Sequence, residues 1–145
     1  MSKLQAVLTG TVPPGVYRFT SRAGVDTLME EATAAGWRLF YLDGNAIEDK
    51  AGLMVASQAA FEFPGYVARN WDALEEAIND LAWAPAAGYV VLIDDVAAFA
   101  AHDPDTWSTA LDILSTSAAN WAQSATPMYV LLRQAGRSAP EVPVL

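Results

Sequence analysis

Hydrophobic positions along this chain alternate between short apolar runs and longer segments in which apolar residues recur every three or four positions. The short runs, rich in β-branched and aromatic residues, predict strands at residues 16–20, 37–42, 89–93 and 128–132. The segments with helical spacing predict helices at residues 25–35, 52–62, 70–81 and 103–123. Strands that alternate with helices indicate the α/β class, here a small, mostly parallel sheet of three to four strands packed with helices.

Local signals support several of these assignments. Pro64 and Gly65 separate the second predicted helix from the third. Asp103 before Pro104 has the residue types of an N-cap and first-turn pair, and predicts where the last helix begins. The run at residues 89–93 is apolar throughout, which is typical of a strand in the middle of a sheet that is covered on both faces.

The helix that begins near Asn70 is apolar on one side and acidic on the other. Its large apolar side chains form one stripe that is expected to face the core: Trp71, Leu74, Ile78 and Leu81. Its other side carries carboxylates and a polar neighbour: Asp72, Glu75, Glu76, Asn79 and Asp80. Like charges four residues apart destabilise an isolated helix by roughly 0.2–0.5 kcal/mol per pair, and no Lys or Arg in the helix relieves this. The pattern therefore indicates an external cation, or else a solvated polar face in which Asp72 and Glu75 form a capping box.

The acidic helix opens a long region of one charge sign. Residues 70–132 hold nine Asp and Glu residues and no Lys or Arg, while the rest of the chain holds the other eight acids and all eight bases. The whole net charge of −9 therefore lies in this region. Such a surface attracts a basic partner and repels nucleic acid, so we expect no direct binding to nucleic acid.

Length and composition indicate one compact domain. The chain has 145 residues, of which 53% are hydrophobic and 17% charged, enough to build a single core. The absence of cysteine excludes disulfides, thiolate metal sites and a cysteine nucleophile. No apolar segment has the length of a membrane span or of a signal peptide core. We expect a monomeric cytoplasmic protein that needs no cofactor or metal and does not bind membranes.

One stretch carries a specific resemblance to a known family. The sequence FPGY at residues 63–66 is followed by NWDAL at residues 70–74 and then by Ile78, Leu81 and Trp83. This pattern resembles the barstar family of intracellular ribonuclease inhibitors. The similarity extends over about residues 37–133, because the predicted strands in that range follow the family's order.

The resemblance also divides the chain into three parts. Residues 1–36 are expected to form an N-terminal extension, a strand plus a helix, packed on the same domain. Residues 37–133 would be the barstar-like domain, and residues 134–145 a loose C-terminal tail.

The resemblance implies that the chain is an inhibitor, not an enzyme. Its partner would be a basic ribonuclease or a related nuclease toxin, whose active site an acidic helix and the adjacent turn block by mimicking RNA phosphates. Tyr66 matches the family's aromatic residue that packs over the catalytic groove, and Glu76 matches its inserted carboxylate. The expected partner-binding residues are Tyr66, Asn70, Asp72, Glu75, Glu76 and Asp80.

The chain departs from the family pattern at several of these positions. Glu76 stands where the family usually has Asp, Glu75 where it has an aromatic residue, and Ala68 where it has a glycine. A further acid of the family's later helix falls near Thr116, and Asp112, one turn away, could replace it. These differences leave the identity of the target enzyme open.

Two other interpretations of the carboxylates stay open. The chain could be an immunity or antitoxin protein for a different toxin on the same scaffold. It could also be a metal-dependent hydrolase in which Glu76, with Asp72 or Asp94, forms an acid/base pair or binds Mg²⁺. Asp94 and Asp95 follow a predicted strand, where open α/β sheets bind ligands, although capping of the next segment is the simpler role. His102, the single histidine, is expected in a loop.

Overall fold

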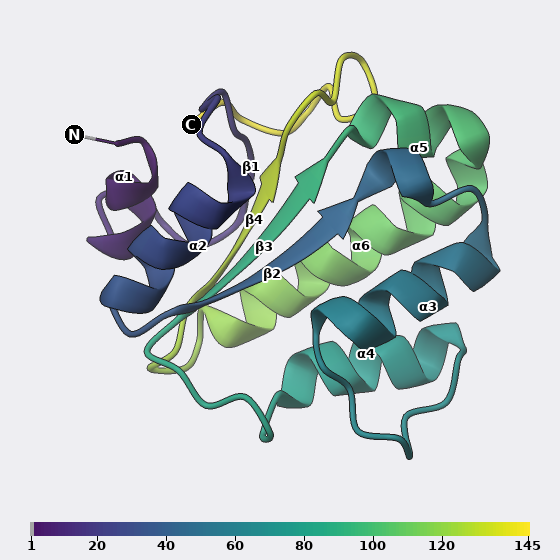
Figure 1. The fold of residues 1–145 in the computed structure, drawn as a ribbon, viewed down its shortest axis with the longest axis horizontal. Coiled ribbons are helices and arrows are strands. Elements are labelled where there is room, and N and C mark those ends of the chain that lie inside the picture. Colours follow the sequence, from purple (N-terminus) through teal and green to yellow (C-terminus); the bar gives the residue numbers. More distant parts are fainter. Residues whose placement is uncertain (1) are drawn as a thin grey trace.

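A parallel sheet runs through the middle of the computed structural model, which describes residues 2–145 (Figure 1). The four strands, in the spatial order β1-β4-β3-β2, are β1 (Val16–Arg18), β4 (Met128–Leu132), β3 (Tyr89–Asp94) and β2 (Arg38–Asp43). One face is covered by α1 (Leu4–Leu8) and α2 (Val25–Ala34). The other is covered by α3 (Lys50–Ala60), α4 (Trp71–Asp80), α5 (Val96–His102) and α6 (Pro104–Trp121). The predicted α/β class and parallel sheet are confirmed.

Successive side chains of the central strands alternate between the two faces of the sheet. In β3, Val90 and Leu92 pack in the cluster that includes α1 and α2, whereas Val91 and Ile93 pack in the cluster that includes α3 to α6. Because successive side chains of a strand point to opposite faces, both sets must be apolar when both faces are covered. This explains why the strand is apolar throughout.

The chain direction explains why the helices divide between the faces. From β2 through β3 to β4 the chain moves steadily across the sheet, and the connecting helices lie on one face. Before that, the chain crosses from β1 at one edge of the sheet to β2 at the opposite edge, through α2. Since crossovers between parallel strands are right-handed, reversing the direction of movement places α2 on the opposite face. The first 36 residues therefore supply an edge strand and the second helical layer.

Two short helices, α1 and α5, were not predicted, and the 3₁₀ turn η1 (Gly44–Ala46) follows β2. The expectation that His102 lies in a loop is wrong, because it is the last residue of α5 and its Nδ1 lies 3.1 Å from the carbonyl oxygen of Ile47. Helix α5 has only seven residues and is rich in alanine, so no apolar stripe marks it in the sequence.

The C-terminal segment, residues 134–145, is packed against the domain, in contrast to the loose tail expected from the sequence. The backbone N–H of Arg18 in β1 donates to the carbonyl of Pro143 at 2.8 Å, and that of Leu145 donates to the carbonyl of Arg18 at 2.9 Å. Trp107 Nε1 donates to the carbonyl of Ser138 at 3.0 Å. These contacts, which join distant parts of the chain, hold the segment along the outer edge of β1.

Candidate partner-binding site

Buried aromatic residues support the segment before α4, residues 63–69, which is called the turn below. Phe63 stacks on Phe61, with ring centroids 5.4 Å apart, and meets the edge of Trp83 at 5.8 Å. Trp83 Nε1 also donates to the carbonyl of Phe61 at 3.0 Å. The next aromatic residue, Tyr66, instead points outward and is 78% exposed. The buried rings fix the turn, and this leaves Tyr66 available for contact with another molecule.

Asn70 sets the start of α4. Its extended backbone and its side-chain oxygen, which accepts from the backbone N–H of Ala73 at 2.8 Å, make it the N-cap. The capping box considered for Asp72 and Glu75 is therefore wrong, since it would need Asp72 at the cap. Asp72 instead lies in the first turn, where a carboxylate interacts favourably with the helix dipole.

The apolar side of α4 is anchored in the core as its sequence pattern predicts. Leu74, Ile78 and Leu81 are buried, while Trp71 is partly buried and packs against the same cluster. Trp121 of α6 adds a polar link, since its Nε1 donates to the carbonyl of Ile78 at 2.9 Å. Anchored from behind in this way, α4 presents its acidic side to solvent as a rigid surface.

A recess of about 280 Å³ lies between the turn and α4. Its walls are the residues Tyr66, Val67, Ala68, Ala73, Glu76, Ala77, Asp80 and Trp83. The alanines give part of the lining a small, apolar character, and the two exposed carboxylates, Glu76 and Asp80, lie one helical turn apart in it. An aromatic ring and two anions around an apolar floor suit a cationic or cation-bearing planar group.

The other predicted residues lie outside this recess. Asp72 and Glu75 are exposed on α4 but do not line it, and the side-chain oxygen of Asn70 is occupied by the helix cap. Asp112 on α6 lines a different groove, next to the C-terminal segment. The structure therefore brings together Tyr66, Glu76 and Asp80, and leaves the remaining predicted residues around them or apart from them.

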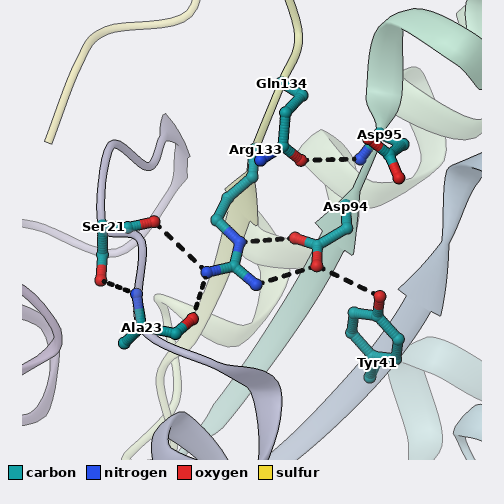
Figure 2. Close-up of polar contacts among 7 residues, drawn as sticks. All are labelled: Ser21, Ala23, Tyr41, Asp94, Asp95, Arg133 and Gln134. Carbon is teal, nitrogen blue, oxygen red and sulfur yellow. Dashed lines mark hydrogen bonds and ion pairs between the residues drawn. The ribbon is translucent and has the colours of Figure 1, made fainter.

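A second polar centre lies at the carboxyl ends of the strands, and Figure 2 shows its contacts. Arg133, just after β4, donates from Nε and Nη2 to the two carboxylate oxygens of Asp94 at 2.5 and 2.8 Å. Its Nη1 donates to the carbonyls of Ser21 and Ala23 at 3.3 and 2.6 Å. The hydroxyl of Tyr41 donates to Asp94 at 3.1 Å. Arg133 thus ties the β1–α2 connection to the central strands.

These contacts change the acid–base properties of the centre. Burial, together with the neighbouring Asp94 carboxylate, raises the pKa of Tyr41 to about 12. The hydrogen bonds to Asp94 raise the pKa of Arg133 further, so the guanidinium remains charged. Arg133 was not among the residues predicted from the sequence, and Asp94 was considered as a cap or a ligand. The Asp94 carboxylate instead forms an internal ion pair with Arg133. Asp95, at the start of α5, makes no side-chain cap.

Among residues 2–145, no group of three or more His, Asp or Glu side chains is placed to hold a metal ion. The hydrolase interpretation pairs Glu76 with Asp72 or Asp94. Asp94 is engaged by Arg133, and Asp72 does not line the recess beside Glu76. The same part of the chain contains no helix long and apolar enough to cross a membrane.

Comparison with protein families matches residues 37–133 to the family described as Barstar (barnase inhibitor). The matched range begins just before β2 and ends at Arg133, so it contains the turn, α4 and three of the four strands. It leaves out α1, β1 and α2. A search of curated proteins gave no match.

Proposed function

The chain belongs to the Barstar (barnase inhibitor) family, and from that premise we propose that it inhibits a basic, barnase-type ribonuclease through the turn and the acidic side of α4. The observation that carries this proposal is the recess where Tyr66, Glu76 and Asp80 converge. In the complex, this surface covers the active site and excludes RNA. The chain acts as an inhibitor in the cytoplasm, and not as an enzyme.

Charge supports this mode of inhibition. A ribonuclease must use cationic side chains to hold phosphates, and in a free active site these cations face only water and ions. The Glu76 carboxylate stands in for a phosphate group and forms charge-assisted hydrogen bonds with them. Asp80, one turn further along α4, adds a second anion beside the same recess. Tyr66 contributes a large apolar ring at the edge of this anionic surface.

Rigidity supports it as well. Binding normally loses free energy when side chains and loops become ordered at an interface. Here the apolar stripe of α4 is buried and the turn is fixed by Phe63 and Trp83, so the backbone is ordered before the partner arrives. Truncation of a hot-spot residue, one of the few that dominate an interface, costs about 2 kcal/mol or more, and a residue of barstar itself is among the known examples.

The experiment is a ribonuclease assay with barnase and further barnase-type ribonucleases. The wild-type chain is expected to inhibit at least one of them, and Glu76→Gln to weaken that inhibition strongly through faster dissociation. Glu30→Gln is the matched control, because it removes the same charge from an exposed site on α2, on the other side of the sheet. Equal inhibition by Glu76→Gln and the wild type would reject the site.

A second candidate is immunity toward a toxin other than a ribonuclease, on the same scaffold. It is favoured by the departures from the family pattern at Ala68, Glu75 and Glu76, which all lie on or beside the proposed surface. Here Glu76→Gln would abolish neutralisation of that toxin, while none of the ribonucleases would be inhibited by the wild type.

A further inference from the structure

A second recess lies beyond the turn from the acidic one, between α3 and the start of α4. It has a volume of about 230 Å³ and is lined by Lys50, Ala51, Met54, Val55 and Arg69. Its wall is largely apolar, and Val55 is a large apolar side chain that is 52% exposed. Two cations, Lys50 and Arg69, stand around it. This recess thus resembles the acidic one in build but has the opposite charge.

A third, much smaller recess of about 10 Å³ has walls in common with both. It shares Val67 and Ala68 with the acidic recess, and it shares Met54 and Arg69 with the basic one. The carboxylates of α4 and the two cations therefore lie on neighbouring parts of the surface, on either side of the turn. A partner that covers the first recess has its neighbouring surface placed over the second.

Neither cation is neutralised by a carboxylate of this chain. Within residues 2–145 the ion pairs are Arg38 with Glu62 and Arg133 with Asp94. Arg69 donates from Nε and Nη2 to the side-chain oxygen of Gln58 at 3.1 and 3.0 Å. The contact holds the guanidinium in place but leaves its charge uncompensated.

Lys50 also stands at a position that helix stability disfavours. Its Nζ lies 5.4 Å from the centroid of the Trp71 ring, a cation–π contact. Lys50 is the first residue of α3, where its charge opposes the positive end of the helix dipole. An acid or neutral residue would suit this position better. Residues that oppose local stability are expected at functional sites, where another interaction gives them a use.

We propose that the basic recess binds a carboxylate side chain of the ribonuclease, next to the enzyme's cationic cleft. This inference rests on the proposed function and specifies the partner: it must present an acid beside its basic active site. The Arg69 guanidinium is suited to bind that carboxylate, with Lys50 as a second charge. The apolar stem of the acidic side chain packs on Met54 and Val55.

This arrangement gives the inhibitor a means of selecting its target. The acidic recess attracts any ribonuclease, because every such enzyme must bind phosphates. Lys50 and Arg69 repel a ribonuclease whose cationic surface extends over this region, and favour one that has an acid there. Specificity then arises from attraction in one recess and repulsion in the other.

The test uses a ribonuclease that the wild-type chain inhibits and that the Glu76→Gln variant inhibits less well. Barnase is the first ribonuclease to be tested. The double variant Lys50→Glu/Arg69→Glu is expected to weaken binding at least about tenfold, since it replaces attraction by repulsion. The melting temperature should stay close to that of the wild type, because both residues are exposed and an acid at the first position of α3 offsets part of the lost contacts with Trp71 and Gln58. The neutral variant Lys50→Gln/Arg69→Gln should give a smaller loss of affinity.

Arg22→Glu/Arg137→Glu is the control for net charge, because it also reverses two exposed cations, in the β1–α2 connection and the C-terminal segment, which lie away from α3 and α4 (Figure 1). It should change the affinity by less than about threefold. Exposed acids of the ribonuclease are then replaced by lysine one at a time. One of these replacements should restore affinity for Lys50→Glu/Arg69→Glu and weaken binding to the wild type.

Several results would overturn the proposal. These are unchanged affinity of Lys50→Glu/Arg69→Glu, an equal loss with Arg22→Glu/Arg137→Glu, or the absence of any compensating replacement in the ribonuclease. Binding of a short RNA oligonucleotide to the free chain through Lys50 and Arg69 would also overturn it, by identifying a phosphate as the occupant. In each of these cases the Glu76→Gln result can still stand. If no ribonuclease is inhibited at all, the proposed function fails and this inference fails with it.

Discussion

Replacing Arg133 by methionine would remove a guanidinium that joins three separate parts of the chain. It binds both carboxylate oxygens of Asp94 at the end of β3, and it binds the carbonyls of Ser21 and Ala23 in the β1–α2 connection. The Arg133 and Asp94 side chains are only 7% and 14% exposed. Methionine keeps most of the apolar bulk but leaves the carboxylate without its counter-ion.

The expected loss of stability follows from the burial of this ion pair. Removing one partner of a buried ion pair typically destabilises a protein by about 3–5 kcal/mol, because the remaining charge stays out of water. Asp94 retains the hydrogen bond from Tyr41 and is partly reached by solvent, so we expect the lower end, about 3 kcal/mol. This is a large part of the roughly 5–15 kcal/mol by which small domains are stable.

Urea unfolding followed by circular dichroism would measure this loss. Arg38→Met is the matched control, because its pair with Glu62 is 39% and 62% exposed and should contribute no more than about 1 kcal/mol. Adding Asp94→Asn to Arg133→Met should recover part of the lost stability, since no unpaired charge then remains. A loss below about 1 kcal/mol for Arg133→Met, or simple additivity in the double variant, would refute this reasoning.

Two further predictions concern single side chains in or near the sheet. The pKa of Tyr41 is about 12 in the folded chain, against 10.0 for a tyrosine in the unfolded chain. Between these pH values the unfolded chain loses the phenol proton while the folded chain keeps it. The free energy of unfolding should therefore fall as pH rises through this range, and Tyr41→Phe should make the fall shallower in urea unfolding; equal slopes would contradict this. Ser117 on α6 is fully buried and its hydroxyl has no hydrogen-bond partner. Ser117→Ala should therefore raise stability by up to about 1 kcal/mol, and a lower melting temperature would contradict it.

The sequence predicted the elements whose signals are local and strong. The stripe from Trp71 to Leu81 identified both α4 and the side that faces the core, and the apolar run from Tyr89 identified the central strand. Asp103 caps α6 as predicted, since its side chain accepts from the backbone N–H of Thr106. Tyr66 and Glu76 are exposed, as a partner-binding role requires.

Features that depend on distant pairing could not be predicted in this way. The ion pair of Arg133 with Asp94 requires knowledge that β3 and β4 are neighbours and end together. The place of the C-terminal segment depends on β1 being an edge strand with free backbone groups. The neighbouring positions of the acidic and basic recesses depend on α3 and α4 lying on either side of the turn, and nothing in the spacing of Lys50 and Glu76 reveals this.

The most direct test of the central claim is competition for the ribonuclease active site. A 3′-mononucleotide occupies the phosphate-binding cations of such an enzyme, and the chain is proposed to occupy the same groups. The apparent dissociation constant of the inhibitor should therefore rise linearly with the nucleotide concentration, and Glu76→Gln should show the same relative rise from a weaker starting affinity. An inhibitor that binds the nucleotide-saturated enzyme with unchanged affinity, forming a ternary complex, would contradict the claim.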